Sequence, residues 1–447
     1  MAPDLTKRYV DEVLELSGVK KKGPERIREI YRMSDRQVEL LVDDITNRAA
    51  KHYNKNLRSI LQYLQEKEKG PKAYYVGLSP VDLDVGRSDQ FIRKCCLYYS
   101  KIVTVDRLEE LRELAPTYTP QSLKNNVATG LGSLALLWPW IEEGIVEIVP
   151  STGIVGGLQE KVFYYAEEDH RDTGMWRSQV LRDEDLNLEG ERLLKSYEDY
   201  IRERCSPRFL EKSGGIQAAT LGVLAFGLSA DMGQGFFNSF VTGSSPTTDR
   251  RRDWRLLGCW ILRRGEHLLT QELGKERWGS LMEEVKASRA WLTLDAHELG
   301  VISNLPPKKI IEIRNSAEYS LRYFREDLGD AIDEIEGLKL EDEKAYHEAA
   351  NQVWSKVRED ARRVRRDLDV IRRKRDLAVD ISFLSIILGL LPFPQAKIVA
   401  GLIGGVQGFD IISGLLEEQG QRKSTGYFLV KLEESSRALE GSAQQTM

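Results

Sequence analysis

Aspartates that follow short apolar runs are the residues of this sequence best suited to chemistry. Asp82 and Asp84 lie in "SPVDLDVGRSD", Asp106 closes "KIVTVD", and Asp249 ends "SSPTTD". In sheet enzymes, carboxylates at the ends of neighbouring strands can converge on Mg²⁺ for hydrolysis of a phosphodiester. Aspartates in such places also cap helices, and the positions of Asp106 and Asp249 suit an N-cap. Capping is the favoured interpretation, and Asp82, Asp84 and Asp106 are the candidate catalytic residues of the Mg²⁺ alternative.

A glycine-rich stretch, "IVPSTGIVGGLQEK", is the second candidate. Gly153, Gly156 and Gly157 follow an apolar run, and Lys161 closes the stretch. Such a turn after a buried strand can direct backbone N–H groups at a phosphate, with the lysine nearby. The spacing departs from GxxxxGK[ST], and no Ser or Thr follows the lysine to hold magnesium. A surface loop is therefore the favoured interpretation, and a cofactor-binding loop is the alternative.

Two further motifs have simple structural explanations. "TGLGSLA" matches the loose GxGxxA pattern, but it lies in an expected helix, so Gly130 and Gly132 are expected to serve helix packing. "EEDHRD" gathers four acids around His170, without a paired-His spacing, and is expected to be an exposed loop. No metal site is assigned, and nucleophilic catalysis has no support because there is no GxSxG elbow and no identifiable histidine partner for a cysteine.

Three short runs are expected to form the sheet that positions these residues. "AYYVGL", "KIVTVD" and "GIVEIVP" are rich in β-branched and aromatic residues and are bounded by Gly, Pro or Asp. Helical stretches separate them, which predicts a small, mostly parallel sheet covered by helices. "KVFYYA" is a possible edge strand, and "RAWLTLDAHELGVISNLPP" is expected to be a last strand or a linker.

Helical periodicity dominates both ends of the chain. Apolar residues recur at three- and four-residue steps from residue 27 to residue 64, which predicts two or three amphipathic helices before Gly70-Pro71. Heptad-like steps from Ala317 to Ile335 and from Ala350 to Ile371, separated by "GLKLEDE", predict a long antiparallel helical hairpin. The expected fold is mainly α, with a small central α/β region and an apolar helix pair after the hairpin.

The apolar pair, Ile381 to Leu416, directly follows a basic run. The first arm has about half of the ~20 apolar residues that a membrane span needs, and the second carries Gln407 and Asp410. A sheltered core is favoured over a conditional membrane element, and a permanent membrane anchor is favoured least.

The basic run Arg362 to Arg375 lacks aromatics and alternates with aspartates, so a solvated coiled-coil face is favoured over nucleic-acid or lipid binding.

Composition limits the broad class of the protein. The net charge of −5 over 447 residues provides no general attraction to nucleic acid or anionic lipid, so such binding would have to be local. The four cysteines form no metal-ligand spacing and suit a reducing compartment. The charged N-terminus lacks a secretion signal's apolar core, and we expect a cytoplasmic, prokaryotic protein.

These observations predict three regions: an N-terminal helical segment (1–71), a central α/β and helical domain (72–305) and a C-terminal helical region (306–447). The leading hypothesis is an intracellular interaction or regulatory protein without a cofactor, which binds a protein partner or itself through the hairpin. One alternative is the metal-dependent phosphodiester hydrolase, with Mg²⁺. Another is a membrane-acting effector of a prokaryotic stress or defence system.

Overall fold

The computed structural model describes most of the first two-thirds of the chain. The described residues are 2–66, 72–75, 89, 91–93, 95–150, 158–181, 184–248, 251–266, 305–318 and 320–323, with isolated positions in 278–285, 326–366 and 427–434. The chain divides into two compact units. The first comprises residues 1–292 with 337–343, and the second comprises 293–336 with 344–447.

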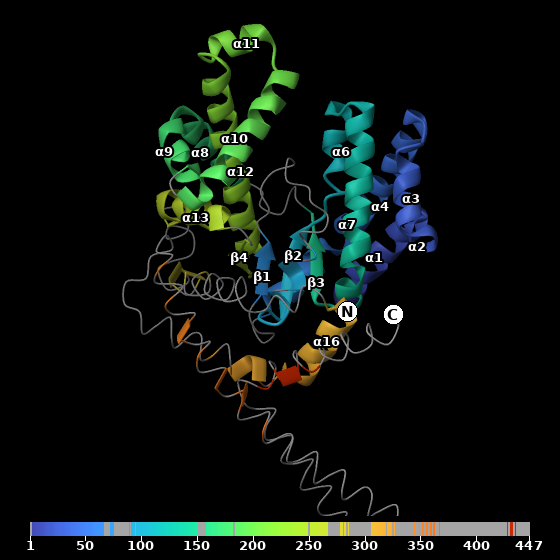
Figure 1. Ribbon diagram of the computed structural model, residues 1–447. Coiled ribbons are helices and arrows are strands. Elements are labelled where there is room, and N and C mark those ends of the chain that lie inside the picture. The colour runs from blue at the N-terminus through green and yellow to red at the C-terminus, as the bar shows by residue number, and fades with distance from the viewer. Residues whose placement is uncertain are drawn as a thin grey trace, which may run out of the picture. The chain divides into compact units, whose positions relative to one another are not determined.

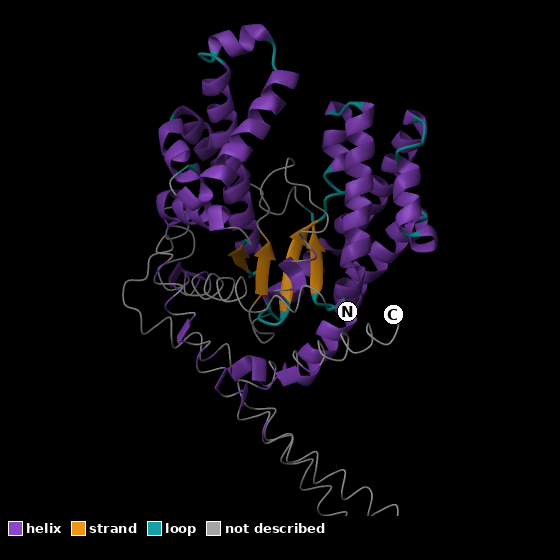
Figure 2. Cartoon of the chain, in the orientation of Figure 1, coloured by secondary structure: helices purple, strands orange, loops and turns teal. Residues whose placement is uncertain are grey.

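The first unit is mainly helical and contains a four-stranded parallel sheet (Figures 1 and 2). The strands are β1 (Lys72–Tyr75), β2 (Lys101–Val105), β3 (Val146–Val149) and β4 (Ser245–Thr247), in the order β3-β2-β1-β4. The three strands expected from β-branched and aromatic runs are confirmed. The fourth, "SPT", was not predicted, because it has only three residues and contains Pro246, which restricts a strand to a sheet edge.

Helices bury both faces of this sheet. Tyr74, Val103 and Glu147 are register partners and therefore share one face. On that face, α12 (Ile216–Val241) donates a hydrogen bond to Tyr74, α1 (Ala2–Leu16) donates one to Glu147, and the Leu64 carbonyl of α4 (Asp35–Gln65) accepts one from Lys72. Tyr75 lies on the other face, where its ring is 4.3 Å from that of Phe91. β3 is buried at all four positions, as expected for a parallel strand covered on both sides.

The N-terminal helices confirm the expected amphipathic segment. α2 (Val19–Lys22) and α3 (Pro24–Ile30) are short, and α4 runs for 31 residues. α4 begins with a capping box: Ser34 accepts a hydrogen bond from the Gln37 N–H, and the Gln37 side chain accepts one from the Ser34 N–H. The apolar stripe of α4 is buried, which fixes this helix to the rest of the unit.

The remaining helices of the first unit connect the strands. Between β2 and β3 lie α6 (Leu111–Leu114), η3 (Ala115–Thr117) and α7 (Pro120–Glu142). Between β3 and β4 lie α8 (Leu158–Arg171), α9 (Thr173–Val180), α10 (Glu184–Arg204), α11 (Pro207–Lys212) and α12. After β4 follow α13 (Arg251–Trp260) and the π-helix η4 (Ile261–Gly265). In Figure 1, α6 and α7 extend beyond the carboxyl ends of the strands on the side of β3. The helices α10 to α12 do so on the side of β4.

Two local predictions are wrong, and both fall in α8. "KVFYYA" is helical rather than an edge strand, and residues 167–171 of "EEDHRD" continue the same helix rather than forming a loop. The aromatic and β-branched composition favoured a strand, but Val162, Ala166 and Asp169 are buried at four- and three-residue steps. That helical period places all three on the face that packs against α12, so tertiary packing outweighs local strand propensity.

Small residues allow α12 to pack closely on its neighbours. A Cβ added at Gly222 would lie 2.5 Å from Cε1 of His170, so no larger residue fits there without a shift. Both glycines of "TGLGSLA" are buried in α7, as expected for a helix. A Cβ added at Gly130 would lie 2.5 Å from Cδ2 of Leu108, so Gly130 serves packing. α12 is also long and apolar enough to cross a membrane, but it packs on α8 and α10, and half of its apolar window is buried.

Two glycines of α12 provide a matched prediction. A Cβ at Gly233 would lie 2.7 Å from Cζ2 of Trp260 and 2.9 Å from Cγ1 of Val162, whereas at Gly227 the nearest atom is 3.6 Å away. Gly233→Ala should therefore lower the unfolding free energy by ~1–3 kcal/mol through overpacking. Gly227→Ala should raise it by ~0.5–1 kcal/mol, because alanine is the better helix former. Urea unfolding of both variants checks this, and equal effects would contradict the packing of α12 described above.

In the second unit, the structure describes α16 (Pro307–Ser316), whose buried side chains are Ile310, Ile311 and Ile313. It begins after Pro306, and Pro307 occupies its first position, where the missing N–H of proline costs no hydrogen bond. Most of the expected hairpin, most of the basic run and the whole apolar pair Ile381 to Leu416 lie outside the described residues. The hairpin therefore stays a prediction.

Candidate functional site

The carboxyl ends of the four strands form one edge of the sheet, because all the strand pairs are parallel. From β1 the chain adds β2 and then β3 on one side, and it returns to place β4 on the other side of β1. The strand order thus reverses between β1 and β4. In open parallel sheets, ligands bind outside the carboxyl ends of the strands at such a reversal.

Each predicted site residue follows one of these strands in the sequence. Asp82 and Asp84 follow β1, Asp106 follows β2, Gly153, Gly156, Gly157 and Lys161 follow β3, and Asp249 follows β4. Of these, the structure describes Asp106 and Lys161, and the others lie outside the described residues. Lys161 is exposed in the first turn of α8.

Asp106 is buried and accepts four hydrogen bonds. Its Oδ2 accepts from the hydroxyls of Tyr9 at 2.6 Å and Tyr53 at 2.9 Å. Its Oδ1 accepts from the backbone N–H groups of Leu108 at 3.0 Å and Glu109 at 3.4 Å. The backbone bonds close the turn at residues 107–110 rather than cap a helix, because α6 begins at Leu111 with Glu110 as its N-cap. The expected N-cap role of Asp106 is therefore wrong, and the tyrosines join α1 and α4 to the end of β2. Both oxygens are thus occupied by donors from the protein itself.

Burial governs the ionisation of this cluster. It raises the pKa of Asp106, although hydrogen bonds from Tyr9 and Tyr53 oppose that shift. Burial, followed by the charge of Asp106, raises the pKa of both tyrosine hydroxyls. His52 stacks on Tyr9 with ring centroids 4.5 Å apart, and burial lowers its pKa to about 4. At neutral pH the histidine is therefore uncharged beside the tyrosines, and the cluster is a structural hydrogen-bond network.

Buried polar groups lie at the junction of β1 and β4. Thr248, directly after β4, is completely buried, and its hydroxyl has no hydrogen-bond partner among the described residues. Asn238 of α12 donates to the Tyr74 hydroxyl at 3.0 Å, while its Oδ1 is buried and likewise accepts no hydrogen bond within the described part of the chain. Strand alternation places Thr248 on the face of Tyr74, because Tyr74 pairs with Pro246. Such atoms are uncommon in folded proteins and are candidate ligand contacts.

A buried ion pair lies in the first turn of α13, which begins four residues after the end of β4. Arg252 and Asp253 are 1% and 2% exposed, and the Arg252 Nη2 lies 3.0 Å from the Asp253 Oδ1. Burying an unpaired arginine would cost several kcal/mol, so the neighbouring carboxylate is what makes this position tolerable. The helix N-terminus that follows β4 is therefore held by charged groups inside the protein.

Another buried carboxylate lies in the middle of β3. Glu147 is 1% exposed, and Thr6 of α1 donates a hydrogen bond to its Oε1. Its Oε2 is buried and accepts no hydrogen bond from any described residue. Burial raises the pKa of Glu147 to about 7, against the opposing effects of the Thr6 bond and the Lys101 charge. A single acid in the otherwise apolar run "VEIV" was the sequence signal for this group.

Three of the four acids of "EEDHRD" form ion pairs with arginines of η4. Asp169 is buried, accepts a hydrogen bond from the Ser229 hydroxyl at 2.7 Å, and lies 3.3 Å from the Arg263 guanidinium. Arg264 also approaches Asp169 and pairs with Glu168 at 2.9 Å. Within the described residues, no group of three or more His, Cys, Asp or Glu side chains could hold a metal ion. This network therefore joins α8, α12 and η4.

Comparison of the sequence and structure with protein-family models, curated proteins and solved structures finds no match.

Proposed function

We propose that this is an intracellular regulatory protein that binds a small phosphate-bearing ligand of the nucleotide class at the carboxyl edge between β1 and β4. The observation that carries the proposal is the reversal of strand order at that position in an all-parallel sheet. The proposal concerns binding, and it includes no catalytic step.

Local chemistry supports an anionic ligand at this edge. The Thr248 hydroxyl can donate a hydrogen bond that no described residue accepts. α13 and α8 both begin shortly after strands end, and a helix N-terminus favours phosphate through its free N–H groups. The glycine-rich sequence between β3 and α8 has the composition of a phosphate-contacting turn.

The regulatory part of the proposal concerns the C-terminal region, residues 306–447. Its heptad-like sequence favours a partner protein or self-association, which would let ligand binding in one unit be read by another protein. The membrane-acting effector stays an alternative that rests on the composition of Ile381 to Leu416.

The hydrolase alternative now depends on Asp82 and Asp84. Asp106 has four protein donors, and a metal ion could use its oxygens only after those bonds break. Phosphate release in the presence of Mg²⁺, lost in Asp82→Asn and Asp84→Asn, would favour hydrolysis over binding alone.

Thermal shift and calorimetry with ATP, ADP, GTP and inorganic phosphate test the binding proposal. A ligand at one hundred times its Kd should stabilise the protein by ~2.7 kcal/mol. Thr248→Val should weaken binding by about tenfold, equivalent to ~1.4 kcal/mol, because it removes one buried donor. Thr220→Val is the matched control, since Thr220 lies in the first turns of α12 and its hydroxyl bonds within that helix. The proposal would be ruled out if none of the four compounds binds, or if Thr248→Val and Thr220→Val lose equal binding affinity.

A further inference from the structure

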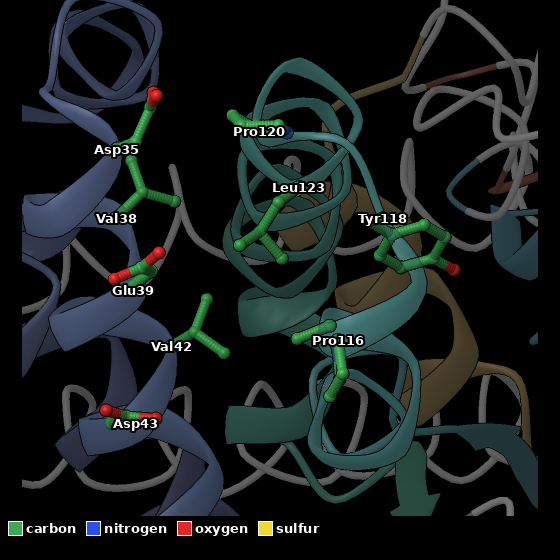
Figure 3. A pocket seen from close by; sticks show the side chains of 10 residues that line it. Asp35, Val38, Glu39, Val42, Asp43, Pro116, Tyr118, Pro120 and Leu123 are labelled. Atoms are coloured by element: carbon green, nitrogen blue, oxygen red, sulfur yellow. The ribbon is translucent and has the colours of Figure 1, made fainter.

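A preformed cleft separates the first turns of α4 from η3 and the start of α7 (Figure 3). Its volume is about 310 Å³, near the lower limit of ~300–1,000 Å³ for ligand pockets. One wall comes from α4 and the other from the η3–α7 connection. It is lined by Asp35, Val38, Glu39, Val42, Asp43, Ala115, Pro116, Tyr118, Pro120 and Leu123.

The base of this cleft is apolar and rigid. Val38 and Val42 of α4 face Leu123 of α7, and all three are buried in the free protein. Pro120 occupies the first position of α7, after the Thr119 N-cap, and Pro116 lies in η3. Fixed proline dihedrals preorganise this wall, which lowers the entropic cost of binding an extended segment.

Carboxylates line the α4 edge of the cleft. Asp35, Glu39 and Asp43 follow one another at four-residue steps and therefore lie on one side of α4. Asp35 pairs with Lys124 at 2.7 Å, and Glu39 pairs with Arg36 at 3.3 Å, but both acids keep more than half of their side-chain surface exposed. Asp43 is exposed and forms no ion pair with a described residue. The edge thus presents negative charge beside an apolar base.

We propose that this cleft docks a short basic segment of a protein partner. One bulky apolar side chain of that segment packs against Val38, Val42 and Leu123, between the two prolines. Flanking Lys or Arg side chains pair with Glu39 and Asp43 at the rim. The small volume fits one anchor residue rather than a whole helix, and the acidic edge repels phosphate backbones and anionic headgroups.

Selection from a random peptide phage library on the intact protein tests the proposal. Peptides that combine Lys or Arg with one aromatic or large aliphatic residue should be enriched. Labelled copies of them should bind with an affinity that falls by about tenfold in Glu39→Lys and Asp43→Lys. Substituting alanine for the apolar anchor of the peptide should also weaken binding by at least that factor.

Asp44→Lys is the matched control. Asp44 is the exposed neighbour of Asp43 on the same helix and does not line the cleft, so this variant makes the same change in net charge. Its affinity for the selected peptides should stay within twofold of the parent's. Equal losses in Asp43→Lys and Asp44→Lys, or a selection without a basic and apolar motif, would overturn the proposal. Circular dichroism and thermal melting establish that all three variants are folded.

Discussion

Replacing Asp106 with alanine is expected to lower the unfolding free energy by roughly 3–5 kcal/mol. The substitution removes the acceptor of the Tyr9 and Tyr53 hydroxyls and of two backbone N–H groups. Each buried donor left without an acceptor costs ~1–3 kcal/mol, and partial rescue of the backbone groups by water keeps the total below the sum. Urea unfolding followed by circular dichroism measures the loss.

A double-mutant cycle separates this network from a general effect of cavity formation. Tyr9→Phe and Tyr53→Phe each remove one donor and should cost ~1 kcal/mol. In the Tyr9→Phe/Tyr53→Phe background, Asp106→Ala should cost at least ~1 kcal/mol less than in the parent, because fewer donors lose their acceptor. Additive effects would mean that the three side chains do not act as a unit, and the network described above would be incorrect.

The change in unfolding free energy also distinguishes a structural role of Asp106 from a role as a metal ligand. A carboxylate poised for metal binding usually destabilises the free protein, so its replacement by alanine raises stability or leaves it unchanged. The four donors that bond to Asp106 predict instead that Asp106→Ala lowers the unfolding free energy. A stable Asp106→Ala variant would therefore return this residue to the list of candidate metal ligands.

Local composition was sufficient to predict three of the four strands. β1, β2 and β3 come from short runs of β-branched and aromatic residues with clear boundaries. The same rule misplaced residues 161–166, because a helix that buries Val162 and Ala166 on α12 has the same composition. It missed β4, whose place in the sheet depends on pairing with β1 more than on its own three residues.

The sites were harder to predict, because their residues are far apart in the chain. The sequence context of Asp106 indicated a helix N-cap, whereas its backbone bonds to Leu108 and Glu109 close a turn ahead of α6. Nothing local indicated that Tyr9 and Tyr53 would converge on it, since the contacts span 97 and 53 residues. The acids of the cleft recur at a visible four-residue step, but the prolines that face them belong to η3 and α7. Tertiary packing alone brings the two together.

Glu147 should make the stability of the protein depend on pH near neutrality. Its pKa rises from 4.5 to about 7 because it is buried. Between these values the native state binds more protons than the unfolded state, so the unfolding free energy must fall as the pH rises through that window. A shift of this size corresponds to roughly 3 kcal/mol, nearly all of it lost by pH 8. His52, with its pKa lowered to about 4, has the opposite slope, because its stability contribution is lost as pH falls from 6.5.

Glu147→Gln isolates the contribution of Glu147 from that of His52. Glutamine retains an oxygen that can accept the Thr6 hydrogen bond, and it cannot ionise. The variant should gain stability relative to the parent as the pH rises from 5 to 8, by up to ~3 kcal/mol, whereas the His52 and Asp106 contributions cancel in the difference. Urea unfolding of both proteins at several pH values measures that difference. If the curves of unfolding free energy against pH are parallel for the two proteins, Glu147 is already ionised at pH 5. The charge of Lys101 would then stabilise the carboxylate more strongly than burial destabilises it.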